Sequence, residues 1–312
     1  MPRRRMRRSV MSASVAAMVV LAGTAAGGAY VANRSADGAA SPVASVASAS
    51  SQAAVAGDGR ASAATDEERE VEYDALVAAA VRPVAGRARL SVAVLDQESG
   101  AGGAYESAAG QTFDTASVVK VDILAALLLT AQDEGRELTA AERASAAAMI
   151  ENSDNASATR LLQVVGGAGA LDAANERLGL TGTTASHAWG LTQTTAADRL
   201  RLLEAVFAEG GGRGAALSAD SRSYVQELMG QVEADQRWGV SAAGDGDGTL
   251  LKNGWMPRTT TGLWDINSVG RVVSGGRTYL VAVLSDGHAT QQEGVALVEA
   301  VAKAAVDAVA AA

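Results

Sequence analysis

The sequence predicts an α/β (α+β) fold in which a five-stranded antiparallel sheet is flanked by N- and C-terminal helices and carries an inserted, all-helical lobe. Three observations support this prediction. Two strand-like segments precede a long run of helical segments, and three strand-like segments follow it. The helical segments have apolar residues at helical spacing and begin at capping residues. A chain of 312 residues that is 48% apolar can also bury a large core.

The first 34 residues differ in composition from the rest of the chain. Five arginines within the first eight residues precede an uncharged stretch over residues 9–33, which is centred on the apolar run 15–22. A basic segment followed by an apolar one is typical of an export signal, and this stretch is also long enough to stay in the membrane. We therefore interpret residues 1–34 as an export signal or signal-anchor. The protein is expected to be secreted or anchored on the outer face of the cytoplasmic membrane.

Residues 35–64 consist mainly of Ala, Ser, Gly and Val, which bury too little surface to offset the entropy of ordering, so a disordered linker is expected there. Residues 65–312 form the expected globular domain. Without the five leading arginines the chain has 21 basic and 35 acidic residues, a net charge near −14. This acidic balance argues against nucleic acid as a partner. There is no cysteine, so a disulfide framework and a thiolate metal site are both excluded.

The first elements of the domain follow from capping residues and alternation. Thr65 and Glu68 have the spacing of a capping box, which predicts a helix that reaches about Val81. Alternating apolar residues over 89–96 predict a strand, and a glycine-rich turn leads into a second strand at Ala104.

The middle of the chain is predicted to be helical. Thr139 and Glu142 form a second capping box, and Gly166 and Gly167 supply a left-handed cap after Val165. The expected helices span residues 117–135 and 139–151, a segment ending at 165, and residues 171–178, 194–208 and 219–229, with 181–194 as a loop.

The C-terminal part returns to strands. Residues 249–255, 262–273 and 278–284 have strand-like composition, and the residues at 274–276 form a Ser-Gly-Gly hairpin turn between the last two. A final helix is expected over residues 291–309. Strands from both ends of the chain are thus expected to share one sheet.

Ser117 and Lys120 lie at the start of the strongly apolar helix in the middle of the chain. Because they are three residues apart, both side chains leave the same side of the helix. A desolvated lysine can take the proton of a serine hydroxyl and so activate it as a nucleophile. Ser153 could relay that proton to a leaving nitrogen, since a hydroxyl both donates and accepts. By themselves, these spacings also fit an ordinary helix start and an ordinary helix cap.

A third motif, Lys252-Asn-Gly254, ends a predicted strand. If it meets the other two motifs, Lys252 would hold Ser153 in register and attract a substrate carboxylate. Gly254 would let the substrate lie against the strand. The N–H of Trp255 could join that of the nucleophile as an oxyanion hole, and Asn155 would offer an amide to the substrate.

These three motifs, in this order on a helix, a helix junction and a sheet edge, resemble those of the class A β-lactamases and the related penicillin-binding serine transferases. The likeness extends over about residues 66–312. It implies an α/β sandwich with a helical lobe, an acyl-enzyme on Ser117, and no metal or other cofactor.

The sequence departs from the family pattern in the loop after the second motif. Class A members carry a glutamate there that activates the deacylating water. Residues 181–194 contain no Asp or Glu, and His187 is the only conventional base among them. This histidine is either a structural loop residue or a substitute base. In the third motif, Asn253 replaces the usual Thr or Ser, which would alter contacts with a substrate carboxylate.

We therefore expect a serine hydrolase that is acylated by β-lactam amides and turns over slowly. The alternatives are a non-hydrolytic penicillin-binding or wall-peptide-binding protein and a peptidase acting on D-Ala-D-Ala ends. Arg237 and Arg258 are expected at the surface, with carboxylate binding as the alternative. His187 and His288 are far apart in the sequence, so a zinc site is not expected. The protein is expected to be a monomer whose partner is a small molecule.

Overall fold

The computed structural model describes residues 58–208, 215–246 and 248–312. The expected export signal and most of the expected linker lie outside these ranges. Within them, no helix is both long and apolar enough to span a bilayer.

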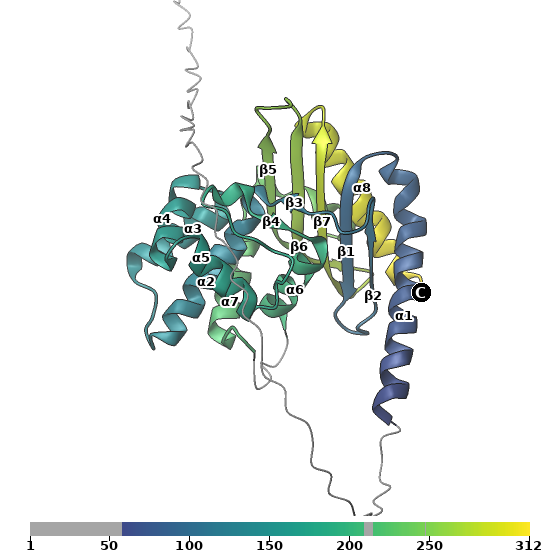
Figure 1. Cartoon of the computed structure of the whole chain (residues 1–312), viewed down its shortest axis with the longest axis horizontal. Coiled ribbons are helices and arrows are strands. Elements are labelled where there is room, and N and C mark those ends of the chain that lie inside the picture. Colours follow the sequence, from purple (N-terminus) through teal and green to yellow (C-terminus); the bar gives the residue numbers. More distant parts are fainter. Residues whose placement is uncertain (1–57, 209–214, 247) are drawn as a thin grey trace, which may run out of the picture. The chain divides into compact units, whose positions relative to one another are not determined.

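A five-stranded antiparallel sheet forms the centre of the domain, with strand order β2-β1-β7-β6-β5 (Figure 1). The strands are β1 (Arg89–Asp96), β2 (Gly102–Glu106), β5 (Leu250–Pro257), β6 (Trp264–Ser274) and β7 (Arg277–His288). The N-terminal strand β1 pairs along its whole length with the C-terminal strand β7, from Arg89 opposite Asp286 to Asp96 opposite Tyr279. This arrangement confirms the predicted sheet, and it makes β5 an edge strand.

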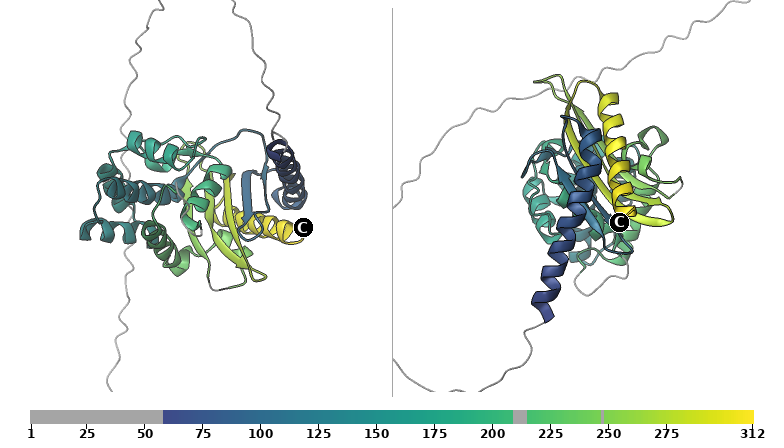
Figure 2. Two further views of the ribbon diagram at one scale, coloured as in Figure 1. Left: turned by 90° about the horizontal axis from the view of Figure 1, so that it is seen from below. Right: turned by 90° about the vertical axis from the view of Figure 1, so that its right-hand side faces the viewer.

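Helices cover both faces of the sheet. Helices α1 (Asp58–Ala85) and α8 (Gln291–Ala310) pack against each other, and α8 lies on β1, β6 and β7 (Figure 2). Helix α6 (Ala196–Phe207) packs on β1 and β7 from the other side. Consecutive side chains of β1 therefore lie on opposite faces of the sheet. Ala93 clusters with Leu284 and Ala196, whereas Val92 and Val94 join the main core.

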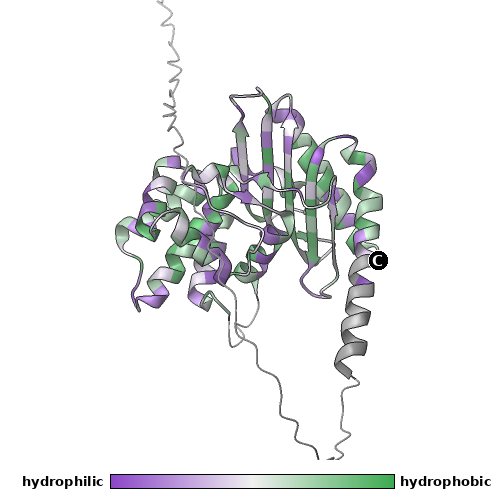
Figure 3. Cartoon of the chain, in the orientation of Figure 1, coloured by the Kyte–Doolittle hydropathy of each residue, from purple (hydrophilic) through white to green (hydrophobic). Residues whose placement is uncertain are grey.

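The helical lobe is built around α2 (Lys120–Asp133), which contacts α3, α4, α5 and α7. These helices are α3 (Ala140–Glu151), α4 (Asn155–Val165), α5 (Ala168–Arg177) and α7 (Ala219–Gly230). Most helices carry both apolar and polar residues, as Figure 3 shows. Helix α2 is buried along most of its length, which is why apolar residues lie on all sides of it.

The two helix signals in the lobe are confirmed. Thr139 accepts a hydrogen bond from the backbone N–H of Glu142, whose side chain accepts from the N–H of Thr139, completing the capping box. Gly166 ends α4 with φ of 111°, a left-handed conformation that favours glycine.

Three local predictions were inaccurate. Helix α1 begins at Asp58 rather than Thr65, because the alanine-rich residues before Thr65 also adopt helix. The segment carrying Ser117 is a separate 3₁₀ turn, η1 (Ala116–Val119), and α2 starts only at Lys120. The expected loop 181–194 contains a 3₁₀ turn, η2 (Trp189–Leu191), and a short strand, β4 (Gln193–Thr194), which pairs with β3 (Phe113–Asp114).

Candidate active site

The three motifs meet around two buried amines. Lys120 Nζ donates to the Ser153 carbonyl oxygen at 2.6 Å, to Ser153 Oγ at 3.0 Å and to Asn155 Oδ1 at 2.8 Å. Lys252 Nζ reaches the same hydroxyl, with 3.1 Å to Ser153 Oγ. A single hydroxyl group, contributed by the junction between α3 and α4, therefore lies between an amine from the lobe and an amine from the sheet edge.

Burial lowers the pKa of both lysines. The chain has three lysines, and the side chains of two of them, Lys120 and Lys252, are fully buried. Desolvation lowers the pKa of Lys120 to about 7, and the nearby Asp154 carboxylate partly opposes this change. Desolvation, together with the charge of Lys120, lowers the pKa of Lys252 to about 7. A large fraction of these amines is therefore uncharged near neutral pH and able to accept a proton.

The hydrogen-bond partners of Lys120 determine which group donates to its lone pair when the amine is uncharged. An uncharged amine has two N–H donors and one lone pair, so one of its three contacts must then be donated by the partner. The Ser153 carbonyl and Asn155 Oδ1 can only accept. The Ser153 hydroxyl must therefore donate to the uncharged Lys120, and it can accept from Lys252 at the same time. This chain of hydrogen bonds can move a proton through Ser153.

Ser117 is held in a strained turn directly before α2. Its neighbour Ala116 has φ of 46° and Ser153 has φ of 56°, both unusual for residues with a Cβ. Residues three apart in a 3₁₀ turn lie above one another, so Ser117 and Lys120 face the same side. Among the hydrogen bonds of the described residues, none involves the Ser117 hydroxyl. The Ser117 hydroxyl is therefore not held by a hydrogen bond within the described structure.

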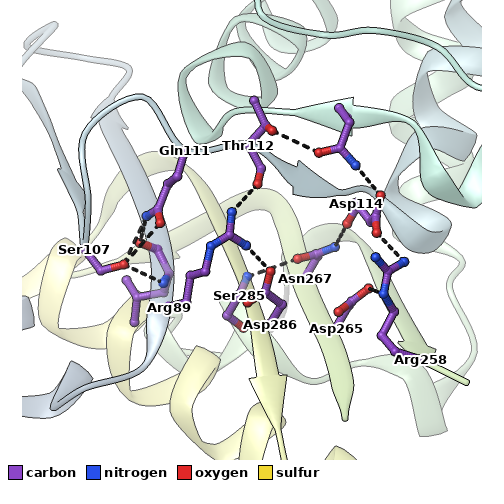
Figure 4. Close-up of polar contacts among 12 residues, drawn as sticks. Arg89, Ser107, Gln111, Thr112, Asp114, Arg258, Asp265, Asn267, Ser285 and Asp286 are labelled. Atoms are coloured by element: carbon purple, nitrogen blue, oxygen red, sulfur yellow. Dashed lines mark hydrogen bonds and ion pairs between the residues drawn. The ribbon is translucent and has the colours of Figure 1, made fainter. Parts of the chain in front are cut away.

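Asn267 positions this turn, and we did not predict it from the sequence. Its Nδ2 donates to the backbone oxygens of Asp114 at 2.9 Å and Thr115 at 3.0 Å, while its Oδ1 accepts from the N–H of Ser285 at 3.1 Å (Figure 4). A fully buried amide thus ties the residues before Ser117 to the centre of the sheet. An asparagine in the middle of a predicted strand was the available signal, because buried polar groups need partners.

Gly254 has a different role from the one expected. A Cβ at this position would lie 2.7 Å from the backbone nitrogen of Ser117, 2.8 Å from the oxygen of Thr115 and 2.9 Å from the nitrogen of Val118. The space beside Gly254 is therefore filled by the turn that carries Ser117 rather than left for a substrate. The glycine lets β5 contact the backbone of η1 directly.

Replacing Gly254 with alanine is expected to lower the rate at which Ser117 reacts with an acylating reagent about 10- to 100-fold, because the added methyl must push the turn that carries Ser117 away from β5. The rate can be measured by intact-protein mass spectrometry. Gly169→Ala, in α5, is the matched control because no atom lies within 4 Å of its Cβ position. Equal acylation rates in the two variants would contradict this role for Gly254.

Asn253 does not line the site, contrary to the sequence-based interpretation. Its side chain is fully buried, and its Nδ2 donates to the carbonyl oxygens of Gln236 at 2.7 Å and Trp238 at 2.9 Å. Neighbouring residues of a strand face opposite sides, so Asn253 points away from the side that carries Lys252. Its amide instead fixes the segment before β5. Trp255 is half-buried and packs edge-on against Trp238, with 5.9 Å between ring centroids.

His187 and Trp189 come from the same loop but differ in their placement. His187 is exposed, and it has no hydrogen bond among those of the described residues. The ring of Trp189 lies over the Lys120 amine, with 5.0 Å from Nζ to the ring centroid. Trp189 Nε1 donates to Thr159 Oγ1 at 3.2 Å. The aromatic residue of this loop, and not its histidine, contacts the lysine.

The arginines near the third motif are engaged by protein groups. Arg258 forms ion pairs with Asp114 and Asp265, with 3.5 Å between Arg258 Nε and the Asp265 carboxylate (Figure 4). Burial raises the pKa of Asp265 to about 6, although the Arg258 charge opposes this. Arg237 donates to the Thr249 carbonyl at 3.2 Å. Neither arginine is bound only to solvent.

A buried ion pair lies on the far side of Lys120. Asp122, two residues further along α2, pairs with Arg199 of α6, and both side chains are fully buried. Arg199 also donates to Thr183 Oγ1 at 3.2 Å, and that hydroxyl donates to Asp198 at 2.7 Å. The pair therefore links the lysine-bearing helix to α6 and to the start of the loop that carries Trp189.

A model of the beta-lactamase enzyme family matches residues 137–309, which is more than half of the chain. The matched segment includes Ser153, Asn155 and Lys252 but begins after Lys120. No curated protein matches the chain.

Solved structures share the fold. A class A beta-lactamase from Bacteroides cellulosilyticus aligns with 77% of this chain and 99% of its own at 16% identity and a TM-score of 0.64. The protein PBP-A aligns with 76% of this chain and 97% of its own at 20% identity and a TM-score of 0.62. An acyl-enzyme complex of a PBP-A variant with penicillin G aligns with 78% of this chain and 97% of its own at 20% identity and a TM-score of 0.61.

Proposed function

We propose that this chain, which belongs to the beta-lactamase enzyme family, opens β-lactam amides by forming an ester with Ser117 and hydrolyses that ester slowly. The observation that carries this proposal is the Ser153 hydroxyl held between two buried amines, 3.0 Å from Lys120 and 3.1 Å from Lys252. Such an arrangement can remove a proton from a nucleophile and return it to a leaving group.

The proposed reaction begins when the Ser153 hydroxyl turns its proton away from the lone pair of the uncharged Lys120 amine. Ser117 Oγ then attacks the amide carbonyl, and its proton passes to that lone pair. The C–N bond then breaks, and the Ser153 hydroxyl gives its proton to the leaving nitrogen while Lys120 replaces that proton. The backbone N–H groups of Ser117 and Trp255 are proposed to stabilise the negative oxygen that forms on attack. Lys252 and Asn155 would orient the substrate through its carboxylate and its amide.

Intact-protein mass spectrometry after mixing with penicillin G tests this proposal. The protein is expected to gain the full mass of the antibiotic, because opening the ring releases no atoms. Ser117→Ala should gain nothing, whereas Ser223→Ala, on the exposed side of α7, should behave as the wild type. If the wild type shows no adduct and no hydrolysis of penicillin G, acylation is refuted. Rapid hydrolysis would refute slow turnover.

The acylation rate is expected to fall as the pH drops below about 7. Lys120 can accept a proton only when uncharged, and its pKa of about 7 means that it becomes protonated below that pH. The rate constant for penicillin G should be measured from about pH 5 to about pH 9. A flat profile would contradict Lys120 as the base.

The small number of lysines allows a direct check of the same pKa values. A protein labelled with ¹³C at lysine Cε should give only three lysine signals, from Lys120, Lys252 and Lys303. Two of them are expected to titrate near pH 7, as a pair of interacting groups. If none of the lysine signals shifts between about pH 6 and about pH 8, the prediction of buried, uncharged amines is contradicted.

A second candidate function is supported by the loop after Ser153. Residues 181–194 have no carboxylate, and Trp189 occupies the space over Lys120. These features favour a penicillin-binding or wall-peptide-binding protein, or a D-Ala-D-Ala peptidase, over an efficient β-lactamase. Release of D-alanine from a D-Ala-D-Ala peptide would favour the peptidase, and an adduct that is never hydrolysed would favour the binding protein.

We also propose that the protein acts outside the cytoplasm. The support is the sequence of residues 1–34, which has a basic start followed by an apolar run. Expression of the whole chain in a bacterium, followed by fractionation, should place it outside the cytoplasm. A variant that lacks residues 1–34 should remain in the cytoplasm.

A further inference from the structure

The turn η2 lies directly beside the nucleophile. The backbone N–H of Thr115 donates to the Thr192 carbonyl at 2.9 Å, and Thr115 Oγ1 lies 3.5 Å from the Trp189 carbonyl oxygen. A Cβ on Gly190 would lie 3.9 Å from Ala116 Cα and 4.0 Å from Met256 Sδ. The short β3–β4 ladder fixes both ends of this contact. η2 therefore touches the turn that carries Ser117 and the strand that carries Lys252.

The Trp189 side chain covers a side of the Lys120 amine that its three polar contacts leave open. Three directions around the amine are taken by oxygens of Ser153 and Asn155. The indole covers a further side at 5.0 Å, within the range of a cation–π contact, and the lysine has no exposed surface. The indole N–H points to Thr159 instead. The group facing the amine is therefore an aromatic carbon surface, which can neither accept a proton nor hold a water molecule strongly.

Hydrolysis of an ester on Ser117 needs a water molecule in contact with both the ester carbon and a base. The water oxygen would bond to the acyl carbon, the bond from that carbon to Ser117 Oγ would break, and the water proton would pass through the base to the serine oxygen. The loop has no carboxylate to act as this base, and Lys120 is covered.

We infer that Trp189 determines the lifetime of the acyl-enzyme: its indole keeps water away from the Lys120 amine, so the ester on Ser117 persists. This inference rests on the proposed acylation of Ser117. It makes Trp189 a specificity-determining residue for the second half of the reaction, in which water competes with other acceptors for the acyl group.

The experiment compares adduct lifetimes after a pulse of penicillin G, followed by intact-protein mass spectrometry. Trp189→Ala is expected to shorten the lifetime about tenfold or more, because water gains access to Lys120. Trp189→His should shorten it as well, since it places a proton-accepting ring in the same position. Trp189→Phe should keep the long lifetime, because it retains an apolar ring. Leu191→Ala is the control within the same turn, since this side chain is 42% exposed.

The outcomes separate this inference from the proposed function. If the wild type forms no adduct, the proposed acylation itself is refuted. An adduct with the same lifetime in the wild type, Trp189→Phe and Trp189→His would overturn the role of Trp189 and leave acylation standing. This comparison of two aromatic rings remains decisive if Trp189→Ala does not fold. A change confined to the rate of adduct formation, with an unchanged lifetime, would also overturn the inference.

Discussion

Replacing Lys120 with methionine is expected to slow the acylation of Ser117 by penicillin G about 100-fold or more. Methionine fills a similar volume but has no lone pair that can take the serine proton, and general base catalysis contributes about 100- to 10,000-fold in enzymes. The substitution also removes a buried amine, so the three oxygens that now contact Lys120 lose a shared donor. The rate of adduct formation, followed by mass spectrometry, measures the effect.

Lys303→Met is the matched control for Lys120→Met. Lys303 lies on α8 with an exposed side chain that forms an ion pair with the exposed Asp307. Its substitution should leave the acylation rate unchanged. If Lys120→Met acylates at the wild-type rate, the proton must go elsewhere, and Lys252→Met would then be expected to abolish the reaction.

Replacing Arg199 with methionine is expected to destabilise the protein by about 3 to 5 kcal/mol. The substitution leaves the carboxylate of Asp122 buried and without a countercharge, which is among the most costly changes in a protein core. One carboxylate oxygen of Asp122 already lacks a hydrogen-bond partner within the described structure. Equilibrium unfolding in urea measures the loss.

Two further variants test the cause of this loss. Arg199→Met combined with Asp122→Leu removes both charges and should recover much of the stability, since a well-packed apolar pair often replaces a buried ion pair without loss. Arg177→Met breaks an exposed pair with Asp133 and should have little effect. A double variant as unstable as Arg199→Met would mean that packing, and not the unpaired charge, accounts for the loss.

Much of the fold follows from local sequence signals. The capping box at Thr139 and the glycine after Val165 are determined by the backbone groups at helix ends, and both appear where the sequence predicts them. Strands β1 and β7 have continuous runs of buried residues because helices cover both faces of the sheet. The two-residue strands β3 and β4 are too short to show any period, so their pairing depends on contacts between distant parts of the chain.

The candidate site was predictable in its components but not in all its contacts. Ser117, Lys120, Ser153 and Lys252 were identified because their chemistry requires those residue types, and the structure brings Lys120, Ser153 and Lys252 into contact. The orientation of Asn253 follows from strand alternation once the side of Lys252 is known. The position of Trp189 could not be derived, because it depends on how the loop packs against α2 and β5.

The pairing of β1 with β7 has a consequence for biogenesis. Arg89 and Asp286 are direct neighbours in the sheet but are separated by most of the domain in sequence. A ribosome must therefore produce nearly the whole polypeptide before the central strands can associate, and the contact is slow to form because it closes a very long loop. Until then the apolar β1 segment has no sheet partner except β2. The five-stranded sheet is therefore completed only at the end of synthesis or after it.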